Sequence, residues 1–460
     1  MAARGLAREG VAVTVVEASR RLGGQVRTVA FEGLAVDVGA EALMVASPAT
    51  EALLAELGLA DTSVTARPGA TWLATPRGLR RLPAGVGPTG PTRLRPVLAS
   101  GILSARGIGR AALEPLMARG RPADGDVAVG DFVARRFGRE VAERFVDPLL
   151  GGIHSGDIHR LSLRACAPQL APLHASGRSV ALAAARRRSS PGVAPRFVTW
   201  PRGLSSLVMA LMDGVDLDLR LGERVAGITR TPQGQGYAVR LASGVSLAAD
   251  GVVLAVPSSV AARLLDGVAP GVAVAVEATR FATVATVLAA LPLKAAEGVP
   301  ALRGTGLMVP STAGRLLKGA TFLSSKWPHL AAPDAHLVRL SAGRAGSSAL
   351  DDRSDEELTA SLLADLADLT GLRAVPAATA VHRWSRALAQ HEVGHPERVQ
   401  AARRALAGAP GVVLAGASYD GGGIAGCLRS GEAAAAAVLA SARPATPPVT
   451  QPREEAESPL

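Results

Sequence analysis

The sequence is poor in aromatic residues, in cysteine and in long apolar runs. Only 3% of its 460 residues are Phe, Trp or Tyr, and the two cysteines, Cys166 and Cys427, lie far apart. Two isolated cysteines exclude a disulfide framework and suit a reducing cytoplasm. Residues 272–293 come nearest to a membrane span, but charged residues interrupt them, and no run reaches the ~18–20 apolar residues that a bilayer requires. The first ten residues have no apolar core, so we expect no secretion signal.

Acidic residues are outnumbered by basic ones, which gives the chain a formal charge of +11. Such a surplus suits an anionic partner, such as a nucleic acid, an acidic membrane surface or a polycarboxylate ligand. The sequence has no zinc-finger spacing and no interleaving of basic and aromatic residues, so we expect no nucleic acid partner. A solvated basic surface is the plainer explanation of the charge alone. With 48% hydrophobic residues, the chain is globular and long enough for two or three packed units.

No glycine fingerprint precedes the first apolar strand. Residues 11–16 form a short apolar run typical of a buried parallel strand, and Glu17 ends it. An acid at that place accepts the ribose hydroxyls of an adenosine, and a G-x-G-x-x-G loop should lie about 20 residues before it. The loss of that central strand would leave buried backbone groups unpaired at about 1–3 kcal/mol each. We therefore expect a start codon assigned too late, with about 15–25 residues upstream; a truncated, inactive chain is the alternative.

Glycine-rich motifs follow this strand. Four residues form the pattern E-x-x-x-R-x-G-G: Glu17, Arg21, Gly23 and Gly24. Residues 37–41 then read D-V-G-A-E. Paired glycines allow a backbone to approach a ligand where side chains would clash. The composite indicates a flavoprotein of the type with two dinucleotide-binding domains.

Further along, the pattern predicts a mostly helical stretch over residues 92–188 and then strands. Within that stretch residues 130–150 have helical spacing, with Phe132, Val133, Phe137, Val141 and Phe145 as candidate core positions. Helices are predicted at 47–57, with Ser47 as N-cap, at 354–369, with Ser354 as N-cap, and at 430–442. Strands are predicted at 245–248, 251–256, 282–290, 320–323, 337–340 and 412–416.

Several longer blocks carry a resemblance to a known family. The most specific are D-P-L-L-G-G-I at 147–153 and K-W-P at 326–328; the others are L-P-A-G at 82–85, F-G-R-E at 137–140, K-G-A-T-F at 318–322, A-L-A-Q-H at 387–391 and L-A-G-A-S-Y-D-G at 414–421. With the glycine motifs, they resemble oxygen-dependent protoporphyrinogen oxidases, especially the coproporphyrinogen-oxidising branch of Gram-positive bacteria. The chain departs from the family pattern in the missing first glycine loop, at Arg202, where Gly is frequent, and at Ala389, where Pro is common.

The resemblance implies an α/β fold with a discontinuous Rossmann-like FAD-binding domain, a sheet-based substrate domain and a helical insert, as in amine oxidases. The implied FAD domain comprises residues 1–55 (truncated), 195–258 and 395–442; the substrate domain 56–88 and 259–394; the helical insert 89–194; and a disordered tail 443–460.

The resemblance also assigns contacts to FAD, residue by residue. They are Glu17 and Ala18 at the adenosine ribose, with Arg21, Gly23 and Gly24 in the adjoining motif; Gln25, Gly39, Ala40, Glu41 and Ala42 at the flavin and ribityl chain; Val225 at the adenine; and Trp384, Gly423, Ile424 and Ala425 at the isoalloxazine end. A helix beginning near residues 423–427 would turn its free N–H groups toward the flavin and stabilise its reduced, anionic form. Arg80 and Arg81 are candidate partners of substrate propionates, although a solvated face explains them as well.

The implied activity is the oxidation of coproporphyrinogen III, of protoporphyrinogen IX or of both to the porphyrin, in haem biosynthesis. A bridging carbon gives hydride to the flavin, and molecular oxygen is then reduced to hydrogen peroxide. Because the flavin carries the redox chemistry, we expect no essential acid–base pair and assign no catalytic residue. We expect a cytoplasmic protein and leave open peripheral membrane contact, a homodimer and haem-pathway partners. A related flavin amine oxidase or desaturase is the alternative on the same scaffold, and an inactive truncated flavoprotein the non-enzymatic one.

Residues 391–395 read H-E-V-G-H, which matches the zinc-protease pattern H-E-x-x-H. That pattern binds zinc only on a helix, where both histidines share one face. Gly394 and Pro396 disfavour a helix there. We therefore expect no metal.

Overall fold

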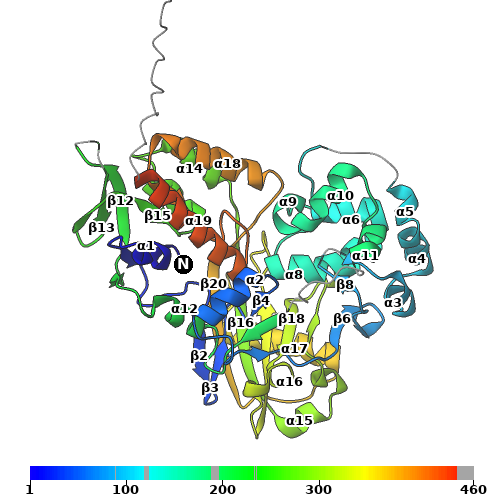
Figure 1. Cartoon of the computed structure of the whole chain (residues 1–460). Helices are drawn as coiled ribbons and strands as arrows, with labels where there is room; N and C mark the ends of the chain where they lie inside the picture. Colours follow the sequence, from blue (N-terminus) through cyan, green and yellow to red (C-terminus); the bar gives the residue numbers. More distant parts are fainter. Residues whose placement is uncertain (89, 119–123, 188–195, 233, 235, 443–460) are drawn as a thin grey trace, which may run out of the picture.

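The structure is a computed structural model that describes residues 1–88, 90–118, 124–187, 196–232, 234 and 236–442. It comprises a large mixed sheet, a group of helices beside it and a layered part that contains α1 and α19 (Figure 1). The predicted disordered tail, residues 443–460, lies outside the described residues.

The largest sheet has seven strands and is buried on both faces. Its order is β20 (Ala378–Ala389), β16 (Phe281–Pro292), β19 (Ala335–Ala342), β18 (Leu317–Phe322), β17 (Gly306–Met308), β6 (Thr71–Thr75) and β7 (Gly78–Arg81). Successive side chains of a strand point to opposite faces, so Val287 and Ala289 of β16 enter one core while Leu288 and Ala290 enter another. The strands predicted at 282–290, 320–323 and 337–340 are therefore confirmed, with β18 beginning earlier.

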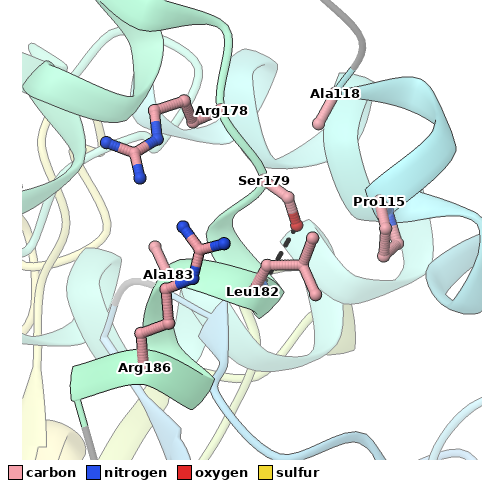
Figure 2. A pocket seen from close by; sticks show the side chains of 7 residues that line it. All are labelled: Pro115, Ala118, Arg178, Ser179, Leu182, Ala183 and Arg186. Carbon is pink, nitrogen blue, oxygen red and sulfur yellow. Dashed lines mark hydrogen bonds between the residues drawn. The ribbon is translucent and has the colours of Figure 1, made fainter.

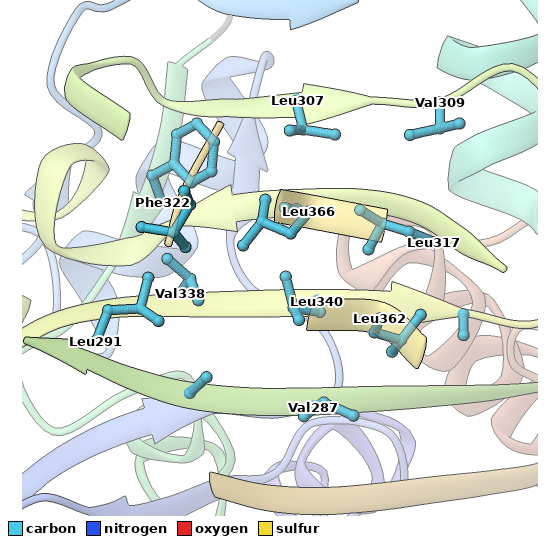
Figure 3. Close-up of a cluster of buried hydrophobic side chains, with 14 of the residues drawn as sticks. Val287, Leu291, Leu307, Val309, Leu317, Phe322, Val338, Leu340, Leu362 and Leu366 are labelled. Atoms are coloured by element: carbon cyan, nitrogen blue, oxygen red, sulfur yellow. The ribbon is translucent and has the colours of Figure 1, made fainter. Parts of the chain in front are cut away.

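Helix α17 (Asp355–Thr370) covers one face of this sheet. Figure 3 shows its Leu362 and Leu366 beside the strands that carry Val287, Val338 and Leu340. Burial of each such side chain contributes about 1.5–3 kcal/mol. The helix begins as predicted, because Ser354 caps it in a capping box with Glu357.

The hairpin of β2 (Thr28–Phe31) and β3 (Leu34–Asp37) packs against the opposite face of the sheet. Its Phe31, Val36 and Val38 share a core with Leu288 and Leu337. The D-V-G-A-E segment at 37–41 is thereby held against the sheet.

Two short parallel pairs of strands lie in the part that contains the chain's first strand. One joins β1 (Thr14–Glu17) to β11 (Asp218–Leu221), and the other joins β15 (Val252–Leu254) to β21 (Val412–Leu414). Across the described ranges, no strand joins one pair to the other. The prediction of a fully buried strand at 11–16 was wrong in its start and its burial: β1 begins at Thr14, and its residues are exposed or half-buried, since it pairs on one side only.

Helix α1 (Ala2–Arg8) packs across α19 (Ile424–Ala442). The approach is close, because a Cβ on Gly5 would lie 3.0 Å from Ala435 and one on Gly431 2.7 Å from Met1. The helix predicted at 430–442 thus begins earlier, at Ile424, within the range 423–427 predicted for a helix start.

The prediction of a mostly helical stretch over residues 92–188 is confirmed for the described residues, and so are its predicted core positions. The predicted core positions, all buried, are Phe132, Val133, Phe137, Val141 and Phe145. Its helices are α3 (Leu94–Ala99), α4 (Ala105–Ala112), α5 (Glu114–Met117), α6 (Val129–Phe137), α7 (Arg139–Val141), the π-helix η1 (Ala142–Gly151), α8 (Gly152–His154), α9 (Leu163–Cys166), the 3₁₀-helix η2 (Pro168–Leu170), α10 (Ala171–Ser176) and α11 (Val180–Arg187). The π-helix contains Pro148, whose ring and missing N–H disrupt ordinary α-helical bonding.

The remaining elements complete the layers. The strands are β4 (Leu43–Val45), β10 (Arg196–Thr199) and β5 (Val64–Thr65) in one sheet, β12 (Val225–Arg230), β13 (Tyr237–Leu241) and β14 (Ser246–Ala249) in another, and the pair β8 (Val86–Gly87) and β9 (Gly90–Pro91). The helices are α2 (Pro48–Glu56), α12 (Ser205–Met212), α13 (Ser258–Leu264), α14 (Pro270–Glu277), α15 (Leu293–Glu297), η3 (Pro300–Arg303), η4 (Ser311–Ala313), α16 (Leu323–Lys326), η5 (Pro328–Leu330), α18 (His395–Ala405) and η6 (Leu406–Gly408). Ser47 caps α2 as predicted.

Candidate functional site

Glu17 is hydrogen-bonded to the turn between β11 and β12 and to the residues that follow it. The Glu17 carboxylate accepts a hydrogen bond from the Ser19 amide at 2.7 Å, and the Glu17 carbonyl accepts one from the Glu223 amide at 3.0 Å. This turn leads into Val225, the first residue of β12. Glu223 Oε2 is buried and has no hydrogen-bond partner among the described residues. Since buried oxygens are normally paired, Glu223 Oε2 is an acceptor still available for a donor group.

The glycine pair that follows forms a turn pinned by Arg21. The Arg21 guanidinium donates to the Gly24 carbonyl at 2.7 Å. Gly23 and Gly24 have φ values of +101° and +56°, which side chains other than glycine rarely adopt. A Cβ on Gly23 would lie 2.7 Å from the Val26 carbonyl oxygen, whereas one on Gly24 would meet no atom within 4 Å. The Gly24 backbone is therefore open to a ligand.

Gln25, Gly39 and Trp384 meet, although they come from three distant segments. The Ala40 amide donates to the Gln25 carbonyl at 3.0 Å, and Trp384 Nε1 donates to the Val38 carbonyl at 3.1 Å. The Gln25 side chain in turn donates to a carbonyl of β20, the strand that carries Trp384. The structure thus brings the predicted flavin residues Gln25, Gly39, Ala40 and Trp384 together.

We expect Gly39→Ala to lower flavin retention at least tenfold. The new Cβ would lie 1.9 Å from the Gln25 carbonyl oxygen, so the segment must move by about 1 Å, which breaks the Ala40–Gln25 contact. The measurement is the ratio of flavin absorbance to protein absorbance after purification. Gly109→Ala on α4 is the control, because its Cβ meets no atom within 4 Å. Equal flavin content in both variants would contradict this prediction.

The Glu41 carboxylate is fully engaged by side chains of the seven-stranded sheet and of the K-W-P block. One oxygen lies 2.6 Å from Lys326 Nζ and 3.1 Å from Trp327 Nε1, and the other lies 2.7 Å from Arg339 and 3.0 Å from Thr321 Oγ1. Burial alone would raise its pKa, but the charges of Lys326 and Arg339 and their hydrogen bonds hold it well below the ordinary value. Only the Glu41 backbone is left for a cofactor contact.

The carboxylate of Asp37, four residues earlier, is buried and forms no ion pair with any described residue, although Arg339 donates to the Asp37 carbonyl at 3.1 Å. The carboxylate accepts from Thr28 Oγ1 at 2.6 Å, from the Leu204 amide at 3.0 Å and from Thr199 Oγ1 at 3.3 Å. Burial outweighs these bonds and raises the pKa of Asp37 to about 6.

Because this folded-state pKa lies above the unfolded value of 3.8, the contribution of Asp37 to stability is full below that value and is lost as pH rises through about 6. We expect the free energy of unfolding of the wild type to fall by about 2 kcal/mol relative to that of Asp37→Asn between pH 4 and pH 7. Urea denaturation of both proteins at the two pH values measures this. A difference between the proteins that does not change with pH would show that Asp37 is already ionised at pH 4.

The turn that precedes α19, residues 416–423, has open space beside three of its glycines. Gly416, Gly421 and Gly423 all have positive φ values, and a Cβ on any of them would meet no atom within 4 Å. Helix α19 starts directly afterwards, while Ile424 and Ala425 pack on the cluster around Leu43 and Trp200. The backbone of the turn, and not these two side chains, is thus free to face a ligand.

A group of three cations, which the sequence analysis missed, lies where the large sheet meets the helical stretch. Lys318 Nζ donates to Ser155 Oγ, and burial, followed by the charges of Arg344 and Arg339, lowers the pKa of Lys318 to about 7. Arg344 donates to the Val309 carbonyl at 2.8 Å, but its Nη1 is buried and, among the described residues, has no hydrogen-bond partner. Such a group fits an anionic ligand. No spacing along the chain reveals it, although Lys318 opens the K-G-A-T-F block.

Arg80 and Arg81, the propionate candidates from the sequence, lie on β7 at the edge of the seven-stranded sheet. Both are exposed, and the Arg81 guanidinium lies over the Trp72 ring, 5.6 Å from its centre. Their role in substrate binding stays a prediction.

A hollow of about 190 Å³ lies apart from these residues, on helices α5 and α11 (Figure 2). Its lining combines apolar side chains with polar and charged ones: Pro115, Ala118, Leu182 and Ala183 with Ser179, Arg178 and Arg186. Ligand pockets typically measure about 300–1,000 Å³, so this hollow is too small for a dinucleotide or a tetrapyrrole. Among the described helices, none is long and apolar enough to cross a membrane.

Comparison with known proteins finds similar sequences over most of the chain. The family model described as flavin containing amine oxidoreductase matches residues 1–439. The chain is 31% identical to coproporphyrinogen III oxidase of Bacillus subtilis (strain 168), over 93% of this chain and 91% of that protein. It is 32% identical to coproporphyrinogen III oxidase of Mycobacterium leprae (strain TN), over 91% and 90% of the two chains.

Two solved structures extend the likeness to the fold. A candidate protoporphyrinogen oxidase from Exiguobacterium sp. 255-15 matches with a TM-score of 0.80 and 27% identity, over 95% of both chains. A putrescine oxidase variant matches with a TM-score of 0.67 at 18% identity, over 95% of this chain and 96% of that one. The second likeness concerns the fold alone.

Proposed function

Since the chain belongs to the family of flavin-containing amine oxidoreductases and is an oxidoreductase with a flavin cofactor, we propose that the flavin is FAD and that the substrate is coproporphyrinogen III, protoporphyrinogen IX or both. The observation that carries this proposal is the similarity to coproporphyrinogen III oxidases over at least nine tenths of each chain. The proposed place of the reaction is haem biosynthesis, with oxygen as the electron acceptor.

Several features of the described residues fit FAD. The unpaired Glu223 Oε2 and the Glu17 turn fit its adenosine end, and the open backbone at Gly24 fits the part between adenosine and flavin. The Gln25–Gly39–Trp384 contact and the glycine turn before α19 fit its isoalloxazine end. When bound, the flavin supplies the acceptor for a hydride, and the protein positions the substrate and excludes water.

The cationic group fits a porphyrinogen better than an amine. A porphyrinogen with propionate chains is an apolar macrocycle with anionic substituents, and Lys318 and Arg344 offer positive charge beside the buried sheet, whereas the charge of Arg339 is paired with Glu41 at 2.7 Å. An amine substrate, itself cationic, would be repelled by Lys318 and Arg344. We propose that Lys318 and Arg344 hold propionates while a bridging carbon of the substrate loses a hydride and then a proton; each such two-electron round would reduce one molecule of oxygen to hydrogen peroxide.

The test is an aerobic assay of the flavin-loaded protein with coproporphyrinogen III and with protoporphyrinogen IX. We expect the non-fluorescent substrate to become a fluorescent porphyrin, with peroxide formed in proportion. Putrescine and a carotenoid precursor serve as comparison substrates. Turnover of either comparison substrate, without turnover of porphyrinogens, would contradict the proposal in favour of an amine oxidase or a desaturase.

A further inference from the structure

Three side chains with metal-ligating atoms converge where the helical stretch meets the loop after β20. His154 ends α8, Cys166 ends α9, and His391 follows β20. One ligand atom of each lies within 4.8 Å of the other two. They come from three segments of the chain, so that the fold and not a spacing motif creates the group.

His391 presents one ring nitrogen without a partner to this group. Its Nε2 lies 2.8 Å from the carbonyl oxygen of Ala417, and a carbonyl can only accept, so Nε2 carries the proton. Its Nδ1 therefore holds a lone pair; it is buried and, within the described part of the chain, has no hydrogen-bond partner. The whole residue is only 1% exposed. An N–H bonded to a carbonyl, with the other nitrogen free, is the arrangement of a metal-ligating histidine.

The environment keeps both imidazoles in the form that binds a metal. Burial, and then the neighbouring His391, lowers the pKa of His154 to about 4, and burial also lowers the pKa of His391. The Cys166 thiol lies 3.6 Å from the His391 carbonyl oxygen. Burial, and then the charge of Asp126, raises the pKa of the Cys166 thiol, so that its proton would leave only when a metal binds, as at other thiolate sites.

We propose that His154, Cys166 and His391 form a Zn²⁺ site with two imidazole ligands and one thiolate. Tetrahedral zinc, with bonds of about 2.0–2.3 Å, places its ligands roughly 3.5 Å apart, so the side chains close in by about 1 Å. The fourth position is left to water or another small ligand. The ion ties α8 and α9 to the connection between β20 and α18.

This site differs from the H-E-x-x-H pattern. His395 begins α18 after Gly394, whose φ is +81°, and residues 391–394 precede that helix, as the sequence predicts. The His395 ring stacks on that of His391 at 4.3 Å between centres, yet His395 lies outside the ligand group. Spacing along the chain does not reveal the ligand group, because its three members come from separate segments.

The test is a titration of the chelator-treated, full-length protein with Co²⁺ as a spectroscopic substitute for zinc. We expect one equivalent to bind with a thiolate-to-cobalt charge-transfer band, and Zn²⁺ to abolish the band by displacement. Cys166→Ser should remove the band, and His391→Asn should weaken Co²⁺ binding at least tenfold. The matched controls are Cys427→Ser, at the other half-buried free cysteine, and His395→Asn, which should keep the band.

Absence of the band in the wild type, or its persistence in Cys166→Ser, would overturn the proposal. Loss of the band in Cys427→Ser alone would overturn it as well, since the thiolate would then be another one. If a substituted protein does not fold, X-ray absorption at the cobalt edge of the wild type decides between the outcomes. One sulfur ligand supports the site, whereas the absence of a sulfur ligand refutes it. None of these readouts depends on porphyrinogen turnover.

Discussion

Glu41→Gln is expected to lower the free energy of unfolding by about 3–5 kcal/mol. The neutral amide leaves Lys326 and Arg339 mostly buried without a counter-charge, and their side chains are 25% and 13% exposed. The same change releases the D-V-G-A-E segment from β18, β19 and α16, which supply its partners. Flavin retention should therefore fall together with stability.

The effect has a distinct pH dependence. Because the folded-state pKa of Glu41 is depressed, its contribution is fully present above the unfolded-state pKa of 4.5 and is lost progressively as pH falls from there through the folded-state pKa. The gap between wild type and Glu41→Gln should thus be largest at pH 7, remain mostly intact at pH 4 and narrow strongly only in stronger acid, as measured by urea denaturation at pH 7, pH 4 and pH 2. Glu277→Gln, at an exposed acid of α14, is the control with no expected effect. A Glu41→Gln protein as stable as this control at pH 7 would contradict the buried ion-pair account.

Lys318→Met is expected to raise the KM for coproporphyrinogen III about 10- to 100-fold, with flavin content unchanged. A hydrogen bond to a charged group contributes about 1.5–3 kcal/mol, and 1.4 kcal/mol corresponds to tenfold in affinity. Since the pKa of Lys318 is about 7, kcat/KM of the wild type should fall as pH rises through 7, when the cation loses its proton. The kcat/KM of Lys318→Met should not show this fall near pH 7.

Lys294→Met, at an exposed lysine of α15, provides the matched control and should retain the wild-type KM. Steady-state kinetics of the three proteins between pH 6 and pH 8.5 separate a role in substrate binding from a structural one, because a structural role would alter flavin content without changing the pH step. An unchanged KM in Lys318→Met would show that the propionates lie elsewhere, for which Arg80 and Arg81 are the remaining candidates.

The resemblance to protoporphyrinogen oxidases and the α/β fold that it implies are confirmed by the comparisons. Local sequence signals predicted the structure reliably where a single effect, such as helix capping or hydrophobic periodicity, decides it. Ser354 with Glu357 marks the start of α17, and Phe132 to Phe145 follow the helical period. The prediction failed where tertiary pairing decides, since the burial of β1 depends on neighbouring strands and not on its own apolar residues.

The candidate site was predictable only in part, for the same reason. Glycine motifs are contiguous, so Gly24, Gly39 and Gly423 stand out in the sequence. The cationic group of Lys318, Arg339 and Arg344 and the His154–Cys166–His391 group are assembled from separate elements. Even Glu41, singled out for a cofactor, proves to have both carboxylate oxygens engaged by other side chains. No pattern along the chain distinguishes these roles.

The central claim, that a bound flavin takes hydride from a porphyrinogen held by this chain, is tested most directly without oxygen. The flavin-loaded protein is mixed anaerobically with excess coproporphyrinogen III, and flavin absorbance is followed in a stopped-flow instrument. The account predicts rapid bleaching of the yellow colour, followed by its return and by porphyrin fluorescence when oxygen is admitted. A flavin that stays oxidised with coproporphyrinogen III and with protoporphyrinogen IX, but is bleached by putrescine, would contradict it.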